Sequence, residues 1–243
     1  EPFQMWGIQG DASLAERLPF VKAGLPGVFV TSDVTPYKKR KVRILNGAHT
    51  GFVPGAWLAC FNIVRDCMHD ETVKGFMNCM LESEVIPSLS GELDKDDLES
   101  FARAVQSRFD NPFIDHQLLS ICLNSTSKWR ARDLPSLEDY VMKNHSVPIC
   151  LATSLAMLIA FYTTNLESRQ EDGLHLCRAD GTAYVAKDDD KVLDFYATHS
   201  KDSDADLVDA ILGNVSMWGK DLHEISGLRD VVADRLALQK SHA

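Results

Sequence analysis

The stretch KVRILNGAH, residues 41–49, opens one of the most apolar parts of the chain, which continues as TGFVPGAWLACF. It places Lys41, Asn46 and His49 on what should be a buried helix. A polar group that is buried without a partner costs about 1–3 kcal/mol. These side chains therefore either find partners inside the protein or face a cavity in which a reaction takes place.

Helical geometry brings the three side chains toward one face. At about 100° per residue, Asn46 and His49 lie about 60° apart, and Lys41 lies about 80° from His49. An amine of lowered pKa can exchange a proton with a hydroxyl group, and an amide and an imidazole can hydrogen-bond a developing oxyanion. The set suits a carbonyl that becomes an alcohol, without a metal. The alternative is a surface lysine, an asparagine that caps the backbone and a core histidine with satisfied nitrogens.

Three glycines, Gly47, Gly51 and Gly55, recur at every fourth position on a neighbouring stripe of the same helix. Glycine in a helix costs about 1 kcal/mol relative to alanine, so close approach of another group is the expected compensation. That group is either a packed helix or a ligand. The stripe also supports a function of another class, a non-catalytic helical module that docks a partner helix.

The composition excludes several classes. The formal net charge of −10 over 243 residues argues against a nucleic-acid partner, which needs a concentrated basic surface. The most apolar run, residues 148–162, is too short for a confident membrane span and fits a buried core helix, so we expect no membrane partner and a cytoplasmic protein. The sequence shows no metal-ligand spacing. We expect reduced core cysteines at six scattered positions: Cys60, Cys67, Cys79, Cys122, Cys150 and Cys177.

The pattern along the chain predicts a mainly α-helical fold with a small β element at the N-terminus. Residues 1–36 are rich in glycine and proline and contain short β-branched pieces. A polar stretch after residue 163, with the acidic run Asp188–Asp190, is expected to be a solvated loop. No glycine-rich nucleotide-binding fingerprint occurs. Helical periodicity predicts helices over 43–64, 69–89, 95–111, 116–129, 134–145, 148–163, 203–218 and 228–240.

A basic group, SKWRAR at 127–132, stands out in this acidic chain with Lys128, Arg130 and Arg132. Arginine offers two parallel hydrogen bonds to a carboxylate, so the group could bind an acidic substrate. The alternative is a solvated turn paired with Asp133 and Glu138.

The segment RFDNPFIDH, residues 108–116, offers further polar side chains near this group. Asn111 precedes a proline and is expected to be a local cap. His116 is expected to be a histidine at a helix start.

KVRILNGAH resembles the Lys-x4-Asn-x2-His motif of the polyol-specific long-chain dehydrogenases, the mannitol dehydrogenase family. The opening EPFQMWGIQG, the segment DVTPYKKRK at 33–41 and the long segment 108–137 also resemble parts of that family. The likeness runs from residue 1 to about residue 163.

The resemblance implies an enzyme of two domains: an N-terminal Rossmann domain that binds NAD, followed by a multi-helical C-terminal domain of the 6-phosphogluconate dehydrogenase C-terminal-like type. Residues 1–36 would be the end of the nucleotide-binding part and the linker, and residues 37–243 the catalytic domain. Lys41 would be the general acid/base, and Asn46 and His49 would polarise the substrate carbonyl. The Rossmann part is absent from this chain, which alone should not bind NAD well or turn over substrate.

The substrate that the resemblance implies is a small sugar acid. The expected reaction reduces D-tagaturonate to D-altronate with NADH, with Lys128, Arg130 and Arg132 on the carboxylate. Fructuronate reduction and mannitol oxidation are the alternatives within the same class.

Overall fold

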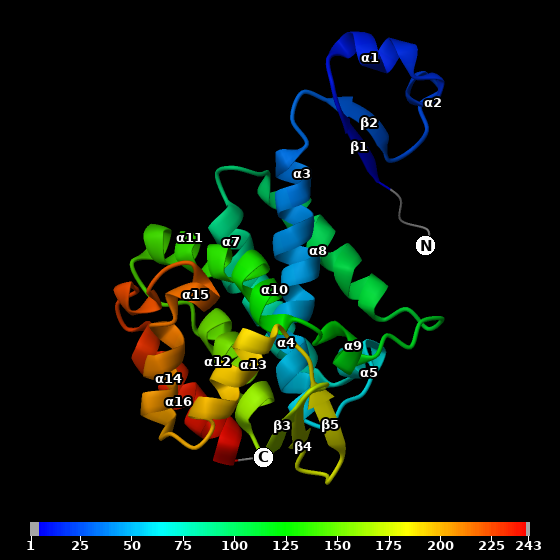
Figure 1. Cartoon of the computed structure of the whole chain (residues 1–243). Helices are drawn as coiled ribbons and strands as arrows, with labels where there is room; N and C mark the ends of the chain where they lie inside the picture. The colour runs from blue at the N-terminus through cyan, green and yellow to red at the C-terminus, as the bar shows by residue number, and fades with distance from the viewer. Residues whose placement is uncertain (1–4, 242–243) are drawn as a thin grey trace. The chain divides into compact units, whose positions relative to one another are not determined.

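The computed structural model describes residues 5–241 and divides the chain into two compact units, Glu1–Val42 and Arg43–Ala243. The first unit is small. Two parallel strands, β1 (Trp6–Gln9) and β2 (Val28–Thr31), are joined by α1 (Ala12–Arg17) and α2 (Pro19–Lys22), and α3 (Thr35–Arg40) follows. This pair is the β element predicted for the N-terminal part of the chain (Figure 1).

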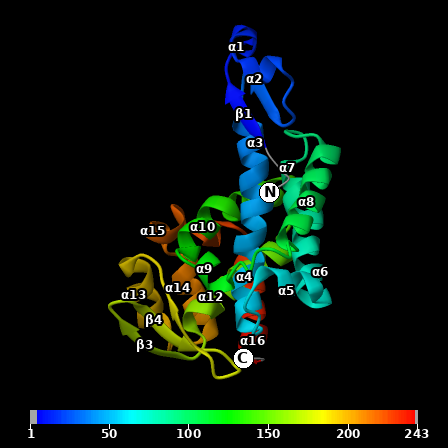
Figure 2. The ribbon, with the colours of Figure 1, turned by 90° about the vertical axis from the view of Figure 1, so that its right-hand side faces the viewer.

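The second unit is mainly helical, as predicted (Figures 1 and 2). A π-helix, η1 (Lys41–Asn46), leads into its first long helix, α4 (Gly47–Leu58). The helices that follow are α5 (Val64–His69), α6 (Glu71–Met80), the π-helix η2 (Leu81–Val85), α7 (Ile86–Leu89), α8 (Lys95–Phe109), α9 (Leu118–Ile121), α10 (Ser125–Arg132), α11 (Leu134–Asn144), α12 (Ile149–Thr163), α13 (Asp190–His199), α14 (Asp204–Leu212), α15 (Val215–Trp218), the 3-10 helix η3 (Leu222–Glu224) and α16 (Leu228–Ser241).

Helix α12 is the centre of the core. It is apolar on all sides, and most of its side chains are buried against α4 and α16. A helix without a polar face must be covered all round, so the apolar run at 148–162 is a core helix, as the sequence predicts. Among residues 5–241 no helix is both long enough and apolar enough to cross a bilayer.

The prediction of a solvated loop after residue 163 was wrong. A three-stranded antiparallel sheet is formed by β3 (Leu166–Gln170), β4 (Gly173–Cys177) and β5 (Ala183–Ala186). Leu174 and Leu176 on β4 alternate into the core, and so do Tyr184 and Ala186 on β5. The strands are short and their outer positions are polar, so their apolar positions are too few to stand out in the sequence. Helix α13 then begins within the acidic run.

Several helix limits also differ from the prediction. The helix expected over 43–64 ends at Leu58, and Pro54 lies inside it without dividing it. Asn124, with a left-handed φ of 53°, separates α9 from α10 where one helix was expected. All six cysteines are free, but Cys79 is exposed, so it is not the core residue that we expected.

Candidate active site

The predicted catalytic motif begins in a π-helix. Residues Lys41–Asn46 form η1, and Asn46 is the N-cap of α4. Short π segments are frequent at functional sites. The uniform α-helical spacing assumed from the sequence therefore does not apply to Lys41, although Asn46 and His49 still lie one α-helical turn apart. Lys41 is exposed.

The imidazole of His49 is packed against aromatic rings. Its ring stacks on Phe109, with centroids 3.9 Å apart and planes 15° apart, and the ring of His116 meets it edge-on at 5.4 Å. Nε2 of His49 is buried and makes no hydrogen bond with any residue in the part of the chain that the structure describes. A buried ring nitrogen without a partner is rare in proteins, so this atom is a place where a ligand group could bind.

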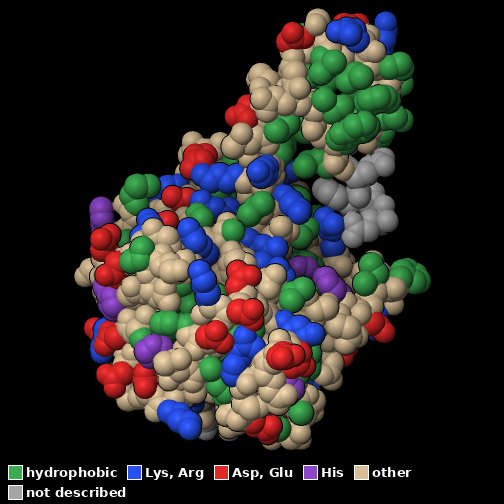
Figure 3. All heavy atoms as spheres, in the orientation of Figure 1, with side chains coloured by type: hydrophobic (Ala, Val, Ile, Leu, Met, Phe, Trp, Pro, Cys, Tyr) green, Lys and Arg blue, Asp and Glu red, His purple; other side chains and the backbone are tan. Residues whose placement is uncertain are grey.

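Positive charge surrounds that imidazole. The pKa of His49 is lowered to about 3, first by burial and then by the charges of His116, Arg132, Arg108 and Lys128 in that order. His49 is therefore neutral at neutral pH. Figure 3 shows Lys and Arg side chains, with His beside them, gathered on the face of the second unit over α10. The site combines a neutral imidazole with a field that favours an anion.

Arg132 joins α10 to the start of α4. Its Nη1 donates to Oγ1 of Thr50 at 3.0 Å and reaches the carbonyl of Asn46 at 3.5 Å. The Thr50 hydroxyl also donates to the Asn46 carbonyl, at 3.0 Å. Burial is the main reason that the pKa of Arg132 is lowered. These bonds hold the guanidinium beside the turn that carries Asn46 and His49.

Lys128 lies one turn before Arg132 on the same face of α10, at the spacing i, i+4. Its Nζ donates to the Ile121 carbonyl at 2.9 Å, and burial, followed by Arg132, lowers its pKa. The N-terminus of α10 is held by Asp188, whose Oδ2 accepts from the Thr126 amide at 3.1 Å and from the Tyr162 hydroxyl at 2.6 Å. Asp188 is thus a structural cap and not part of a solvated loop.

Arg130 does not lie with the other two basic residues. Its guanidinium packs against Gly219 and reaches the Met217 carbonyl at 3.5 Å, on the far side of α10. Arg130 is two residues from both Lys128 and Arg132, and two helical steps rotate a side chain by about 200° around the axis. Arg130 therefore points away from the face that carries the other two. The segment is helical and not the turn that we considered.

Asp133, which we considered as a partner in a solvated turn, is fully buried. Its two carboxylate oxygens make no hydrogen bond within residues 5–241, and burial raises its pKa well above the usual value, while Arg132 and Arg43 oppose that rise. Arg43 itself pairs with Asp139 at 2.6 Å. Glu138 pairs with Lys220, not with the basic group.

Two residues near His49 were not assigned to the site from the sequence. Arg108 acts on His49 through its charge, and His116 touches its ring although a helix-start role was expected. His116 lies in the segment before α9, and its carbonyl accepts from the Val64 amide at 3.0 Å. Asn111 is a local cap, as predicted, since its side chain accepts from the Phe113 amide at 2.9 Å. Only tertiary packing reveals the contact between His49 and His116.

The glycine stripe of α4 is covered by the protein's own helices. A Cβ on Gly51 would lie 2.5 Å from Cε of Met80 on α6, and one on Gly55 would lie 2.4 Å from Sδ of Met157 on α12. All three glycines are buried. The close approach expected from the sequence is therefore a helix contact, and the stripe offers no docking surface.

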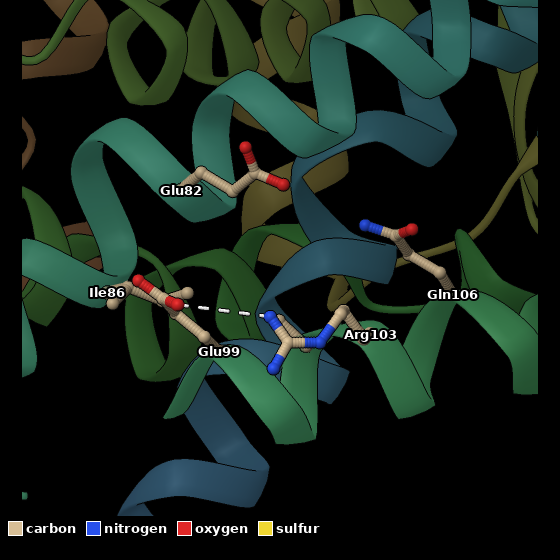
Figure 4. A pocket seen from close by; sticks show the side chains of 6 residues that line it. Glu82, Ile86, Glu99, Arg103 and Gln106 are labelled. Atoms are coloured by element: carbon tan, nitrogen blue, oxygen red, sulfur yellow. Dashed lines mark ion pairs between the residues drawn. The ribbon is translucent and has the colours of Figure 1, made fainter. Parts of the chain in front are cut away.

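A separate hollow lies between η2 and α8. It is a cavity of about 250 Å³ lined by Glu82, Glu99, Arg103 and Gln106 among others. Figure 4 shows the ion pair between Glu99 and Arg103, 3.8 Å apart. None of the predicted site residues lines it. Within residues 5–241 no group of three or more His, Cys, Asp or Glu side chains is arranged to hold a metal ion.

This architecture is that of the multi-helical C-terminal domains of polyol dehydrogenases. It matches mannitol 2-dehydrogenase from Pseudomonas fluorescens, solved as a ternary complex with NAD and D-mannitol, with a TM-score of 0.72 at 20% identity over 89% of this chain and 42% of that one. A D-sorbitol dehydrogenase in substrate-free form matches with a TM-score of 0.66 at 20% identity, over 92% of this chain and 41% of that one. These likenesses concern the fold.

Residues 33–238 match the family model of the mannitol dehydrogenase C-terminal domain, and the chain belongs to this family. The resemblance seen in the sequence is thereby confirmed. Among curated relatives, altronate oxidoreductase from Pectobacterium atrosepticum is 41% identical over 97% of this chain, and that from Klebsiella pneumoniae (strain 342) is 42% identical over 96%. The chain spans about half the length of these relatives, 47% in both cases.

Proposed function

We propose that this chain is the substrate-side catalytic domain of a cytoplasmic NAD-dependent oxidoreductase that interconverts a keto-uronate and a sugar acid, with D-tagaturonate and D-altronate as the pair. In this proposal Lys41 exchanges the hydroxyl proton, while Asn46 and His49 hydrogen-bond the carbonyl oxygen on which charge develops. Residues 1–36 form the end of the nucleotide-binding part and the linker, and residues 37–243 form the catalytic domain.

The observation that carries the proposal is the buried Nε2 of His49 without a hydrogen-bond partner in the described residues. The ring is held by Phe109 and His116, so its orientation is fixed before substrate binds. A preorganised group aimed at a developing oxyanion supports catalysis more than a mobile one, because it does not need to reorganise during the reaction. With its pKa lowered to about 3, His49 acts as a neutral hydrogen-bonding group and not as a proton donor of ordinary acidity.

The basic residues support an acidic substrate. Lys128 and Arg132 lie on one face of α10, and both act electrostatically on His49. A uronate carries a carboxylate, for which arginine is a bidentate partner. Arg130 points to the other side of α10, so we assign the carboxylate to Lys128 and Arg132.

The residues that the structure describes do not form a site that fits a dinucleotide. Within residues 5–241 no glycine-rich turn between a strand and a helix carries the nucleotide-binding fingerprint. The roles proposed for this chain are therefore substrate binding, orientation and proton transfer. The parallel pair β1 and β2, joined by helices, is the kind of unit from which doubly wound nucleotide-binding sheets are built. This supports the assignment of residues 1–36 to the end of such a sheet.

The choice of substrate draws on the relatives. Several at about 40% identity are named altronate oxidoreductase, whereas the mannitol 2-dehydrogenase complex contains a neutral polyol. Fructuronate and the fructose–mannitol pair are the alternatives within the class. A non-catalytic docking module is not favoured, because its proposed surface, the glycine stripe, is buried.

The test follows NADH absorbance in the full-length protein that contains this chain, with tagaturonate, fructuronate and fructose offered separately. We expect rapid NADH oxidation with tagaturonate alone. Lys41→Ala should lower kcat by about 10²–10⁴-fold, the contribution typical of a general acid/base.

The matched control is Lys38→Ala, which removes another exposed lysine one turn earlier in the same helical segment and should leave kcat unchanged. A preference for fructose would keep the mechanism but overturn the carboxylate role of Lys128 and Arg132. A folded, NADH-binding protein that oxidises NADH with none of the three would overturn the proposed substrate class.

A further inference from the structure

Two cysteines from distant parts of the sequence lie in contact on the second unit. Sγ of Cys150, near the start of α12, is 3.3 Å from Sγ of Cys79 on α6 and donates a hydrogen bond to it. Cys79 is exposed and Cys150 is half-buried, so the pair can be reached from solvent. The thiols of Cys60, Cys67 and Cys177 instead donate to backbone carbonyls.

The backbone around the pair is fixed by Glu84. Its two carboxylate oxygens accept from the amides of Cys150 and Leu151, each at 2.7 Å, so this residue of η2 caps the N-terminus of α12. Since η2 continues directly from α6, the same stretch of chain carries both Cys79 and the cap. The two sulfurs are held together by this arrangement and do not meet by chance motion of loops.

The environments of the two thiols differ. Burial raises the pKa of the Cys150 thiol, and the neighbouring Glu84 carboxylate raises it further, so this thiol resists direct oxidation. Cys79 is the sulfur open to a dissolved oxidant. Exposure therefore assigns the roles: Cys79 meets the oxidant first, and Cys150 lies beside it as the resolving thiol.

We propose that Cys79 and Cys150 are a thiol-oxidation site that hydrogen peroxide converts to an intramolecular disulfide. Peroxide oxidises the Cys79 sulfur to a sulfenic acid, with release of one water. The Cys150 sulfur then attacks that sulfur, the sulfenic oxygen leaves as a second water with the Cys150 proton, and the S–S bond forms. Two thiols and one peroxide thus give one disulfide and two waters, and a dithiol reductant reverses the change.

The bond requires only a short movement. A disulfide has its sulfurs about 2.05 Å apart, so the two atoms must approach from 3.3 Å. The product would tie α6 to α12. Both helices pack on α4 behind the candidate active site, where Met80 of α6 and Ser154 of α12 lie near Gly51. The site is independent of the proposed enzymatic function, and so is its test.

The experiment treats the protein with hydrogen peroxide, alkylates the remaining thiols, digests the protein and maps the peptides by mass spectrometry. We expect a Cys79–Cys150 linked peptide that disappears after dithiothreitol. In Cys150→Ser, Cys79 should be trapped as a sulfenic acid by dimedone. In Cys79→Ser, Cys150 should remain available for alkylation.

The control is Cys177→Ser, which should form the linked peptide in unchanged yield, and circular dichroism checks that each variant is folded. Disulfides of Cys79 with any cysteine other than Cys150 would overturn the proposal. So would full alkylation of Cys79 after peroxide treatment, or its passage to sulfinic acid in the wild type without a linked peptide.

Discussion

The ring of His49 lies flat on the ring of Phe109, 3.9 Å between centroids, with the last residue of α8 supporting the imidazole that α4 presents. Phe109 is itself buried. The stack excludes water from one face of His49, and burial is the main cause of its lowered pKa. The neutrality of this histidine is therefore a property of the packing between α4 and α8.

Acid should destabilise the protein through His49. In the unfolded chain this residue titrates near pH 6.5, whereas in the folded chain its pKa is about 3. Between these values the unfolded state binds the proton and the folded state does not, so the free energy of unfolding falls as pH decreases from 6.5 toward 3, by about 1.4 kcal/mol per pH unit. Above pH 6.5 the contribution is constant.

The measurement compares urea unfolding of wild type and His49→Asn at pH 8 and pH 5. Between pH 8 and pH 5 the free energy of unfolding should fall by about 2 kcal/mol less in the variant than in the wild type. His145→Asn is the control, since His145 is exposed and its left-handed backbone suits asparagine. Titration of the His49 ring near pH 6.5 in an NMR experiment would contradict this prediction.

Arg132 should discriminate between acidic and neutral substrates. In the full-length protein, Arg132→Met should raise KM for the keto-uronate by about 10–100-fold, because a charge-assisted hydrogen bond contributes about 1.5–3 kcal/mol. Any slow turnover of fructose should be unaffected. The matched variant is Arg130→Met, which removes a guanidinium on the other side of α10 and should leave both KM values unchanged. Equal losses with both substrates would show that Arg132 acts only through its bonds to Thr50 and Asn46.

Two glycine-to-alanine substitutions should have opposite effects on stability. Gly51→Ala brings a Cβ to 2.5 Å from the buried Met80 side chain and should lower the free energy of unfolding by about 1–3 kcal/mol. Gly75→Ala, at an exposed position of α6, meets nothing within 4 Å and should raise the free energy of unfolding by about 0.5–1 kcal/mol. Chemical denaturation of both variants checks the pair. A stable Gly51→Ala variant would mean that Met80 moves aside at little cost.

The cap of α12 should also be measurable. Glu84→Gln replaces one of the two acceptor oxygens by an amide nitrogen and should cost about 1–3 kcal/mol, since it leaves a buried helix N-terminus partly unsatisfied. Glu82→Gln, two residues earlier and exposed, should change the unfolding free energy by less than about 0.5 kcal/mol. The two variants are compared by their denaturant midpoints of unfolding. Equal midpoints would argue against a capping role for Glu84.

The long helices could be predicted from the sequence because their apolar positions repeat over many turns. Helix α8 also has Asp96 and Asp97 in its first turn, and α12 is apolar throughout. The sheet β3–β5 was missed because its strands have only four or five residues each. The break at Asn124 depends on a left-handed backbone position that no local pattern required.

For the candidate site, the sequence could indicate the motif but not its surroundings. Asn46 and His49 are close in sequence, so their proximity follows from the helix alone. The contacts of His49 with Phe109 and His116 join residues about sixty apart, and depend on how α8 and the segment before α9 fold back on α4. The divergence of Arg130 from Lys128 and Arg132 follows from helical geometry once the segment is known to be a helix. The catalytic and substrate roles of these residues stay predictions.

The bond from the Thr126 amide to Asp188 joins residues that are 62 apart in the sequence, so the N-terminus of α10 depends on a segment that follows the three-stranded sheet. Helix α10 has eight residues and follows a left-handed asparagine, and so short a helix is marginal without tertiary support. Its N-terminus is completed only when the chain beyond β5 has been synthesised and has docked on Tyr162. We therefore expect a chain truncated before residue 188 to lack this bond to the N-terminus of α10, the helix that carries Lys128 and Arg132.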